Sequence, residues 1–367
     1  MYNIKDYLSR GTKFANNILF PSRKKLSTLM FYSTSLCNSR CKHCLVWAKR
    51  PVEHMSKDKI VEIMQSRCIS KNTTIGLEGG EFLLHPEATE ILKWFSENHP
   101  KFELLSNCLQ PKRVIDAVKN YPPVRLYISL DGTKETYEYM RGADGFGKVI
   151  ETIEACKDIV PISLMFTLSP YNTFDDLNYV VNIAKKYNID IRIGIYNDID
   201  FFNTVEKAHE TAIGEAGKEK EHGIYDNFKK QIPENVKETS ENYDFLVLYD
   251  EWRNGKLKLN CYSIFDSLVI HPDGSIPVCQ NLDIKLGNVY EKSLDEIYNG
   301  ISSRKIQKQY AHNCNQCWIN FHRKYDIVLL RTLEKFLPKS FIQLFYGKYN
   351  WTNDKKMTYK QFMNKYL

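Results

Sequence analysis

The sequence predicts an α/β fold, a partial (βα)6 TIM-like barrel of parallel strands. Between residues 27 and 196, short β-branched runs alternate regularly with amphipathic helical patterns. Such alternation is typical of parallel strands joined by right-handed crossovers. The runs number six, fewer than the eight strands that close a barrel. A doubly wound open sheet stays possible from periodicity alone.

The individual elements follow from the same periodicities. The predicted strands span residues 27–34, 73–79, 102–106, 124–130, 161–168 and 189–196. The predicted helices span residues 55–67, 87–98, 111–119, 145–158 and 173–187.

The strands have one apolar and one polar face. In the fourth strand every second residue from Val124 to Leu130 is apolar, whereas Arg125 and Tyr127 point the other way. A polar inner face needs water or a ligand, so it indicates a cavity. Inward positions that could line this pocket are Glu78, Arg125, Tyr127, Met165, Thr167, Arg192 and Tyr196.

Composition and charge exclude several classes of protein. With 43% hydrophobic and 26% charged residues, the chain is not disordered, and its longest apolar stretches are too short to span a membrane. The first residues lack a secretory pattern, so a cytoplasmic location is expected. The ten cysteines are then reduced thiols or metal ligands.

The remaining chain divides by composition. The predicted units are a basic N-terminal helix (1–26), the barrel (27–202), a solvated helical bridge (203–258), a small cysteine-bearing unit (259–321) and a basic helical tail (322–367). Residues 1–50 carry a net charge of +9 and residues 321–367 of +7, which leaves −9 for the middle. Solvated terminal helices are favoured, with docking to an anionic membrane as the alternative. Binding to nucleic acid is not expected.

Two groups of cysteines stand out. Cys37, Cys41 and Cys44 follow the first strand, on a loop where parallel α/β folds collect ligands. Three thiolates can hold a [4Fe–4S] cube with one iron open, and the spacing favours this over zinc completed by His43. Cys68, Cys108 and Cys156 stand alone, as small buried residues do.

The second group comes late in the chain. Cys261 and Cys279 flank a strand, an Asp-Gly turn and a return strand, which predict a hairpin over residues 269–278. Cys314 and Cys317 follow a helix predicted near 293–309. Four thiolates suit either a structural zinc ion or a fully ligated [4Fe–4S] cluster.

Further motifs make the barrel resemble the radical S-adenosylmethionine (radical SAM) superfamily over residues 27–196. After the three-cysteine loop, Glu78-Gly79-Gly80-Glu81, Ser106-Asn107-Cys108 and Ser129-Leu130-Asp131-Gly132 end successive strands, and Arg141-Gly142 follows. Two departures are Phe82, where proline is frequent, and Cys108, where glycine is usual.

The resemblance implies a radical SAM barrel that binds a [4Fe–4S] cluster through Cys37, Cys41 and Cys44, together with S-adenosylmethionine. By that resemblance, the methionyl amino group would be bound by Gly79, Gly80 and Glu81. Its carboxylate would pair with Arg141, the ribose hydroxyls would contact Asn107 and Ser129, and adenine would stack on His43. A reduced cluster would cleave the sulfonium and give a 5′-deoxyadenosyl radical that abstracts hydrogen from substrate.

The second cysteine group, C-x12-G-x4-C followed by C-x2-C, is similar to the SPASM domain in its shortened form, called twitch. This similarity implies one auxiliary [4Fe–4S] cluster on Cys261, Cys279, Cys314 and Cys317, acting as an electron relay. The resulting expectation is an oxidoreductase that oxidises or rearranges a small sugar- or polyol-like substrate, reduced by a flavodoxin or ferredoxin. The alternatives are a peptide-modifying maturase of the SPASM group and a non-catalytic, zinc-stabilised binding protein.

Overall fold

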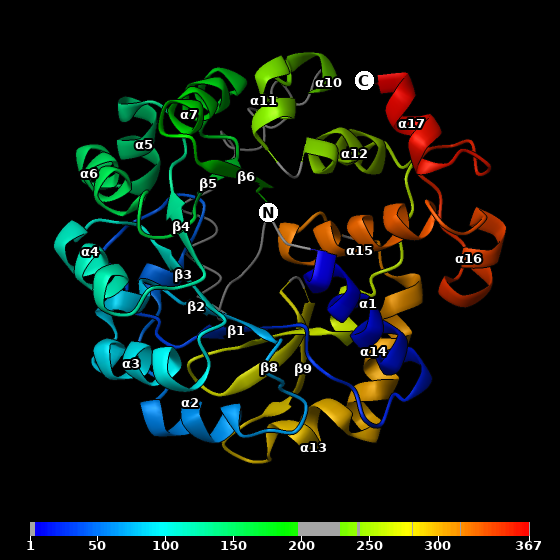
Figure 1. Cartoon of the computed structure of the whole chain (residues 1–367), viewed down its shortest axis with the longest axis horizontal. Helices are drawn as coiled ribbons and strands as arrows, with labels where there is room; N and C mark the ends of the chain where they lie inside the picture. The colour runs from blue at the N-terminus through cyan, green and yellow to red at the C-terminus, as the bar shows by residue number, and fades with distance from the viewer. Residues whose placement is uncertain (1–3, 197–227, 241–242, 281, 316, 367) are drawn as a thin grey trace.

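The computed structural model of the chain describes residues 4–196, 228–240, 243–280, 282–315 and 317–366. Its main element is a parallel sheet of seven strands in the order β6-β5-β4-β3-β2-β1-β7. Figure 1 shows this sheet curling, with α2 to α7 along its outer side. The α/β partial barrel is therefore confirmed, with one more strand than predicted.

All six predicted strands and the five predicted helices of the barrel form. The strands are β1 (Thr28–Tyr32), β2 (Thr74–Glu78), β3 (Phe102–Ser106), β4 (Arg125–Ser129), β5 (Ile162–Leu168) and β6 (Asp190–Ile195). The helices are α2 (Lys57–Met64), α3 (Ala88–Asn98), α4 (Pro111–Asn120), α5 (Lys134–Arg141), α6 (Phe146–Cys156) and α7 (Phe174–Tyr187). Of these, α5 was not predicted.

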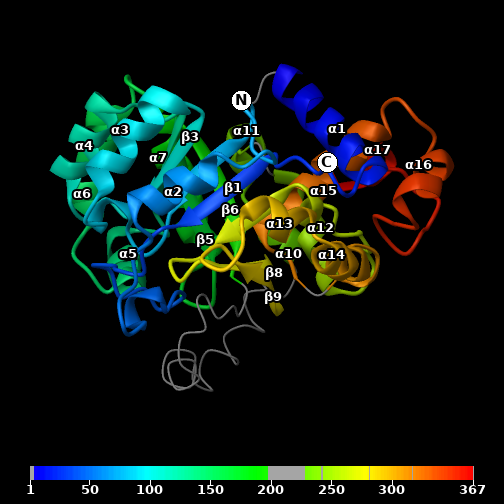
Figure 2. The ribbon, with the colours of Figure 1, turned by 90° about the horizontal axis from the view of Figure 1, so that it is seen from below.

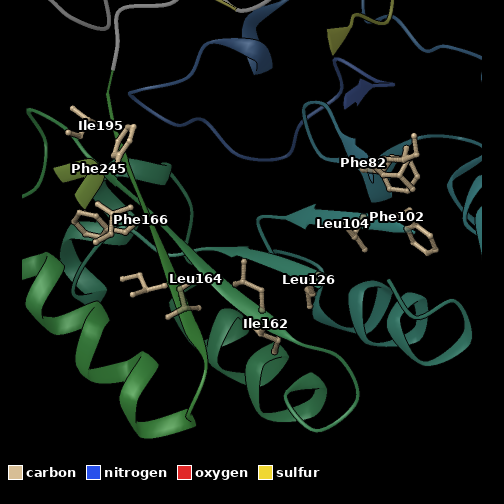
Figure 3. Close-up of a cluster of buried hydrophobic side chains, with 14 of the residues drawn as sticks. Phe82, Phe102, Leu104, Leu126, Ile162, Leu164, Phe166, Ile195 and Phe245 are labelled. Atoms are coloured by element: carbon tan, nitrogen blue, oxygen red, sulfur yellow. The ribbon is translucent and has the colours of Figure 1, made fainter. Parts of the chain in front are cut away.

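The apolar faces of the strands form the core beneath the helices. Leu104, Leu126 and Leu164 are at most 1% exposed, and Figure 3 shows them between the strands and the surrounding helices. The three lone cysteines, Cys68, Cys108 and Cys156, are all buried, as predicted.

The seventh strand corrects the predicted hairpin. β7 (Ser267–Ile270) pairs in parallel with β1, whereas β8 (Ser275–Cys279) pairs antiparallel with β9 (Leu282–Asn288). The predicted turn forms between β7 and β8, with Gly274 at a φ of +80°. The two strands enter different sheets because the free edge of β1 offers backbone partners to β7.

The other predicted units also differ from the structure in places. In the predicted bridge, residues 203–227 and 241–242 lie outside the described residues. The rest forms α10 (Phe228–Gln231), α11 (Glu234–Thr239) and α12 (Tyr243–Arg253), and α12 buries Phe245 and Leu248 in the core instead of being solvated. Gly300 divides the helix predicted near 293–309 into α13 (Leu294–Asn299) and α14 (Ile301–Asn313).

The terminal helices lie together on one side of the molecule. They are α1 (Ile4–Leu19), α15 (Asn320–Leu333), α16 (Lys339–Tyr346) and α17 (Tyr359–Tyr366). Both views show them on the side of the molecule opposite α3, α4 and α6 (Figures 1 and 2). α15 crosses the predicted boundary at residue 321, and its Arg323 is fully buried, so this helix belongs to the body of the protein. No described helix has the length and apolar character needed to cross a membrane.

Candidate functional site

The loop with the first three cysteines is fixed to the end of α5. The backbone N–H of Arg40 donates to the carbonyl of Arg141 at 2.9 Å, and that of Lys42 donates to Met140 at 2.8 Å. The Ser39 hydroxyl donates to the same Arg141 carbonyl at 2.9 Å. Helix α5, which was not predicted from the sequence, therefore orients the cysteine loop.

Two glycines let the end of β2 approach this loop closely. The backbone N–H of Gly80 donates to Thr34 at 2.7 Å, and that of Glu81 donates to Leu36 at 2.8 Å. A Cβ on Gly79 would lie 2.4 Å from the Thr34 carbonyl oxygen, and one on Gly80 would lie 2.3 Å from that of Leu36. Only glycine permits this contact, which brings Glu81 beside the cysteine loop.

The Glu81 carboxylate is held by the end of β3. It accepts hydrogen bonds from the Ser106 hydroxyl at 3.0 Å and from the backbone N–H of Asn107 at 2.8 Å. Burial raises the pKa of Glu81 to about 7, although these bonds favour its charged form. Cys108, in the position where glycine is usual, has a φ of +58°, so it adopts the conformation that glycine favours.

Donor groups point at the sulfur atoms of the loop. The Asn107 amide lies 3.8 Å from Cys37 Sγ, and an Arg141 guanidinium nitrogen lies 3.6 Å from Cys41 Sγ. Arg141 also donates from Nε to Asp131 at 2.7 Å and forms an ion pair with it through Nη2. Donors and a positive charge near sulfur stabilise thiolates, which is the form that binds metal.

The two other predicted contacts to S-adenosylmethionine lie close by. Burial and the charge of Arg141 lower the pKa of His43 to about 4, so its ring is neutral. Its Nδ1 is buried and has no hydrogen-bond partner among the described residues. Ser129, the last residue of β4, is also buried.

Cys37 and Cys44 of the loop are thiols until they bind metal. Burial raises the pKa of Cys37 to about 12 and that of Cys44 to about 11, so uptake of a metal would release protons. Within the described residues, no three His, Cys, Asp or Glu side chains are grouped closely enough to hold one metal ion.

The four late cysteines converge on one cavity. Cys261, Cys279, Cys314 and Cys317 all line it, although up to 56 residues separate them in sequence. The other lining residues are Ile264, Val278, Leu282, Tyr310, His322 and Arg323. Four sulfur donors with mostly apolar walls fit a fully ligated iron–sulfur cluster.

Sequence reasoning missed two residues of this cavity, His322 and Arg323 on α15. Arg323 is fully buried and donates to the carbonyls of Cys317 at 2.9 Å and Leu259 at 3.1 Å. Its charge lies beside the cysteines, where it would offset the negative charge of a thiolate-bound cluster. The sequence offered little signal, because arginine in a helix is ordinarily a surface residue.

The polar inner face of the barrel forms a hydrogen-bonded network. Arg125 donates to Ser163 at 2.7 Å, Ser163 donates to Asp190 at 2.6 Å, and Arg192 binds the same carboxylate at 2.6 Å. Nearby, the Tyr127 hydroxyl donates to Glu103 at 3.3 Å. The remaining predicted pocket residues are Glu78 at the end of β2, Met165 and Thr167 on β5, and Tyr196 after β6.

Both cysteine groups lie in segments of the chain that match known protein families. Residues 31–184 match the sequence model of the radical SAM superfamily, and residues 261–318 match that of an iron–sulfur cluster-binding domain, SPASM. The chain carries a radical SAM domain followed by a SPASM domain. Its two matched domains imply [4Fe–4S] clusters and S-adenosylmethionine as cofactors, and all seven predicted ligand cysteines lie inside the matched segments.

This radical SAM chain is similar to two curated proteins of Bacillus subtilis. It is 25% identical over 77% of its length to AlbA, an antilisterial bacteriocin subtilosin biosynthesis protein. It is 22% identical over 77% of its length to SkfB, a sporulation killing factor maturation protein. The chain spans 61% and 66% of the length of these two relatives.

Solved structures share the fold. Streptococcus suis SuiB bound to S-adenosylmethionine has a TM-score of 0.55 at 14% identity, covering 84% of this radical SAM chain and 74% of SuiB. SuiB bound to its precursor peptide SuiA has a TM-score of 0.56 at 14% identity, covering 84% and 72%.

Proposed function

We propose that this radical SAM chain is an oxidoreductase that abstracts hydrogen from a peptide substrate. The observation that carries the redox part is the convergence of four late cysteines on one cavity, beside a barrel with its own three-cysteine loop. Two such sites can serve hydrogen abstraction and removal of the remaining electron. When bound, the cofactors supply one-electron chemistry, in which reductive cleavage of S-adenosylmethionine yields the radical that takes hydrogen from the substrate.

The chain's own residues would bind and orient these groups. Cys37, Cys41 and Cys44 would ligate the cluster that binds S-adenosylmethionine. The Glu81 carboxylate, oriented by Ser106 and Asn107, would accept the methionyl amino group beside Gly79 and Gly80. These glycines keep the end of β2 next to the loop.

The other contacts follow from the same geometry. Arg141 would pair with the methionyl carboxylate while Asp131 fixes the orientation of its guanidinium. The ribose hydroxyls would bind Asn107 and Ser129. His43, neutral and with a free Nδ1 among the described residues, would stack on adenine. The cysteines of the cavity, Cys261, Cys279, Cys314 and Cys317, would ligate the auxiliary cluster.

A peptide substrate is better supported than the sugar-like molecule that the sequence suggested. AlbA is named for biosynthesis of a bacteriocin and SkfB for maturation of a killing factor, and one SuiB structure contains a precursor peptide. The zinc-stabilised binding protein is less supported, because the two cysteine groups lie in segments that match the radical SAM superfamily and an iron–sulfur cluster-binding domain.

Metal content and nucleoside release test the redox part. The chain reconstituted without oxygen is expected to hold about eight irons, falling to about four when Cys37, Cys41 and Cys44 are all changed to alanine. With S-adenosylmethionine present and dithionite or reduced flavodoxin as the electron donor, 5′-deoxyadenosine should form only with the intact chain. Cys156→Ala, at a lone buried cysteine, is the control and should keep its iron. Zinc in place of iron, or nucleoside from the triple variant, would contradict the assignment.

Substrate class is tested separately. The reduced enzyme is incubated with a synthetic peptide library and, in parallel, with a panel of polyols and sugars. Peptides that lose two hydrogens by mass spectrometry, in step with 5′-deoxyadenosine, would support the proposal. Oxidation of a polyol with every peptide unchanged would favour the small-molecule substrate instead.

A further inference from the structure

Helix α16 presents its apolar face to solvent. Phe341, Leu344 and Phe345 are spaced to share one side of the helix, and they are 45%, 79% and 61% exposed. Ile342, on another side, is only 1% exposed and packs on the body. A surface helix normally turns such a stripe inward, so this orientation requires an explanation.

The exposed surface continues toward the start of α16. Phe336 is 78% exposed and Leu337 is 37% exposed, just before the helix begins. We call Phe336, Leu337, Phe341, Leu344 and Phe345 the apolar tail face. Single exposed apolar residues are common, but five within ten residues mark an interaction surface.

Helix α1 packs against α16 and is followed by further exposed apolar side chains. Its Phe14 stacks on Tyr346 of α16 with ring centroids 5.1 Å apart. α1 ends in Leu19, followed by Phe20, and both side chains are exposed.

The segment of the chain that carries the apolar tail face is strongly positive. Residues 335–367 contain seven lysines and one acidic residue, Asp354. The exposed lysines among them are Lys335, Lys348, Lys355, Lys356, Lys360 and Lys365. The preceding carboxylate, Glu334, accepts bonds from the Tyr349 hydroxyl and the Trp351 indole, both at 2.8 Å. Aromatic and leucine side chains edged by lysines are the chemistry that binds an anionic lipid surface.

We propose that the apolar tail face docks on an anionic phospholipid bilayer. α16 lies in the interface, where the phenylalanines and leucines insert among the acyl chains. The exposed lysines before and after α16 stay at the headgroups, because their long stems reach along the apolar surface while the ammonium groups remain hydrated. This inference is independent of the proposed chemistry, since it uses no residue of the cysteine sites.

Vesicle binding by the full reconstituted chain tests the proposal. The chain should sediment with phosphatidylcholine vesicles that contain phosphatidylglycerol, bind pure phosphatidylcholine much more weakly, and lose binding as salt is raised. The variant Phe341→Ser/Leu344→Ser/Phe345→Ser should bind at least about tenfold more weakly. Ile301→Ser, at an exposed apolar residue on α14, should bind like the wild type. Both variants should keep the wild-type thermal midpoint, because they change exposed side chains.

Three results would overturn the proposal. The first is no binding to the anionic vesicles, and the second is equal binding by the triple variant and the wild type. The third is a wild-type dimer in light scattering that the triple variant converts to a monomer, which would make this face an interface between copies of the chain.

Discussion

The side-chain amide of Gln280 donates a hydrogen bond to the hydroxyl of Tyr32, and this bond joins the two cysteine groups. Tyr32 ends β1, from which the first cysteine loop leads off, and Gln280 follows Cys279 directly. The Tyr32 ring also stacks on His271, with centroids 6.0 Å apart and planes 7° from parallel. Burial raises the pKa of Tyr32, so the hydroxyl stays neutral and can accept this bond. The SPASM segment is thereby fixed against the barrel between the two sites.

The first prediction concerns this bond. Tyr32→Phe should lower the free energy of unfolding by about 1 kcal/mol, because the half-buried Gln280 amide loses its acceptor. Urea unfolding of wild type and variant, prepared with equal iron content, measures the difference. Tyr290→Phe, at an exposed tyrosine, is the control and should change nothing. Equal stability of Tyr32→Phe and wild type would mean that the bond contributes no net stability.

The second prediction concerns the close approach at Gly80. Gly80→Ala should lower the free energy of unfolding by about 2 kcal/mol or more, because the added Cβ meets the backbone of Leu36 and forces the strand end away. Iron content should fall with it, since the same backbone carries Cys37. Gly147→Ala on α6, where a Cβ meets nothing within 4 Å, should leave stability unchanged or slightly raised. A stable, fully loaded Gly80→Ala chain would refute this account.

The third prediction tests whether Arg141 positions S-adenosylmethionine without being needed for binding of the cluster. Arg141→Lys keeps the positive charge but cannot reproduce the paired contact with Asp131. The variant should retain its iron, whereas its rate of 5′-deoxyadenosine formation should fall by about tenfold or more. Arg67→Lys, whose side chain is 90% exposed, should match the wild type. An unchanged rate would show that Arg141 does not position S-adenosylmethionine.

The fourth prediction is a pH dependence carried by Glu78. Burial and then the charge of Glu103 raise the pKa of Glu78 from 4.5 to about 8. The folded chain therefore holds this proton more tightly than the unfolded chain, so its stability should fall as pH rises from about 4.5 to about 8. Glu78→Gln has no such proton. Its free energy of unfolding, relative to that of the wild type, should therefore rise by about 1 kcal/mol or more between pH 5 and pH 8.

Urea unfolding at the two pH values measures this gain. Glu97→Gln, at an exposed residue of α3, should show the same pH dependence as the wild type. A constant difference between Glu78→Gln and wild type would mean that Glu78 titrates alike in the folded and unfolded chains.

The sequence by itself determined the local features of this protein. Strand positions follow from a period of two, because successive side chains of a strand face opposite sides of the sheet. The first cysteine group was readable because its members lie within eight residues on one loop. Helix α5 was the exception, since it is short and polar and depends on its Thr133 cap and on Gly142 at a φ of +61°.

Only the tertiary structure decided which distant segments meet. Nothing in the pattern of residues 267–270 shows that they pair with β1 instead of with their neighbours along the chain. The position of Arg323 beside four cysteines and the pairing of Arg141 with Asp131 depend in the same way on packing between separate elements. Periodicity records which face of an element is buried, whereas the partner on that face is fixed by shape and charge complementarity across the whole chain.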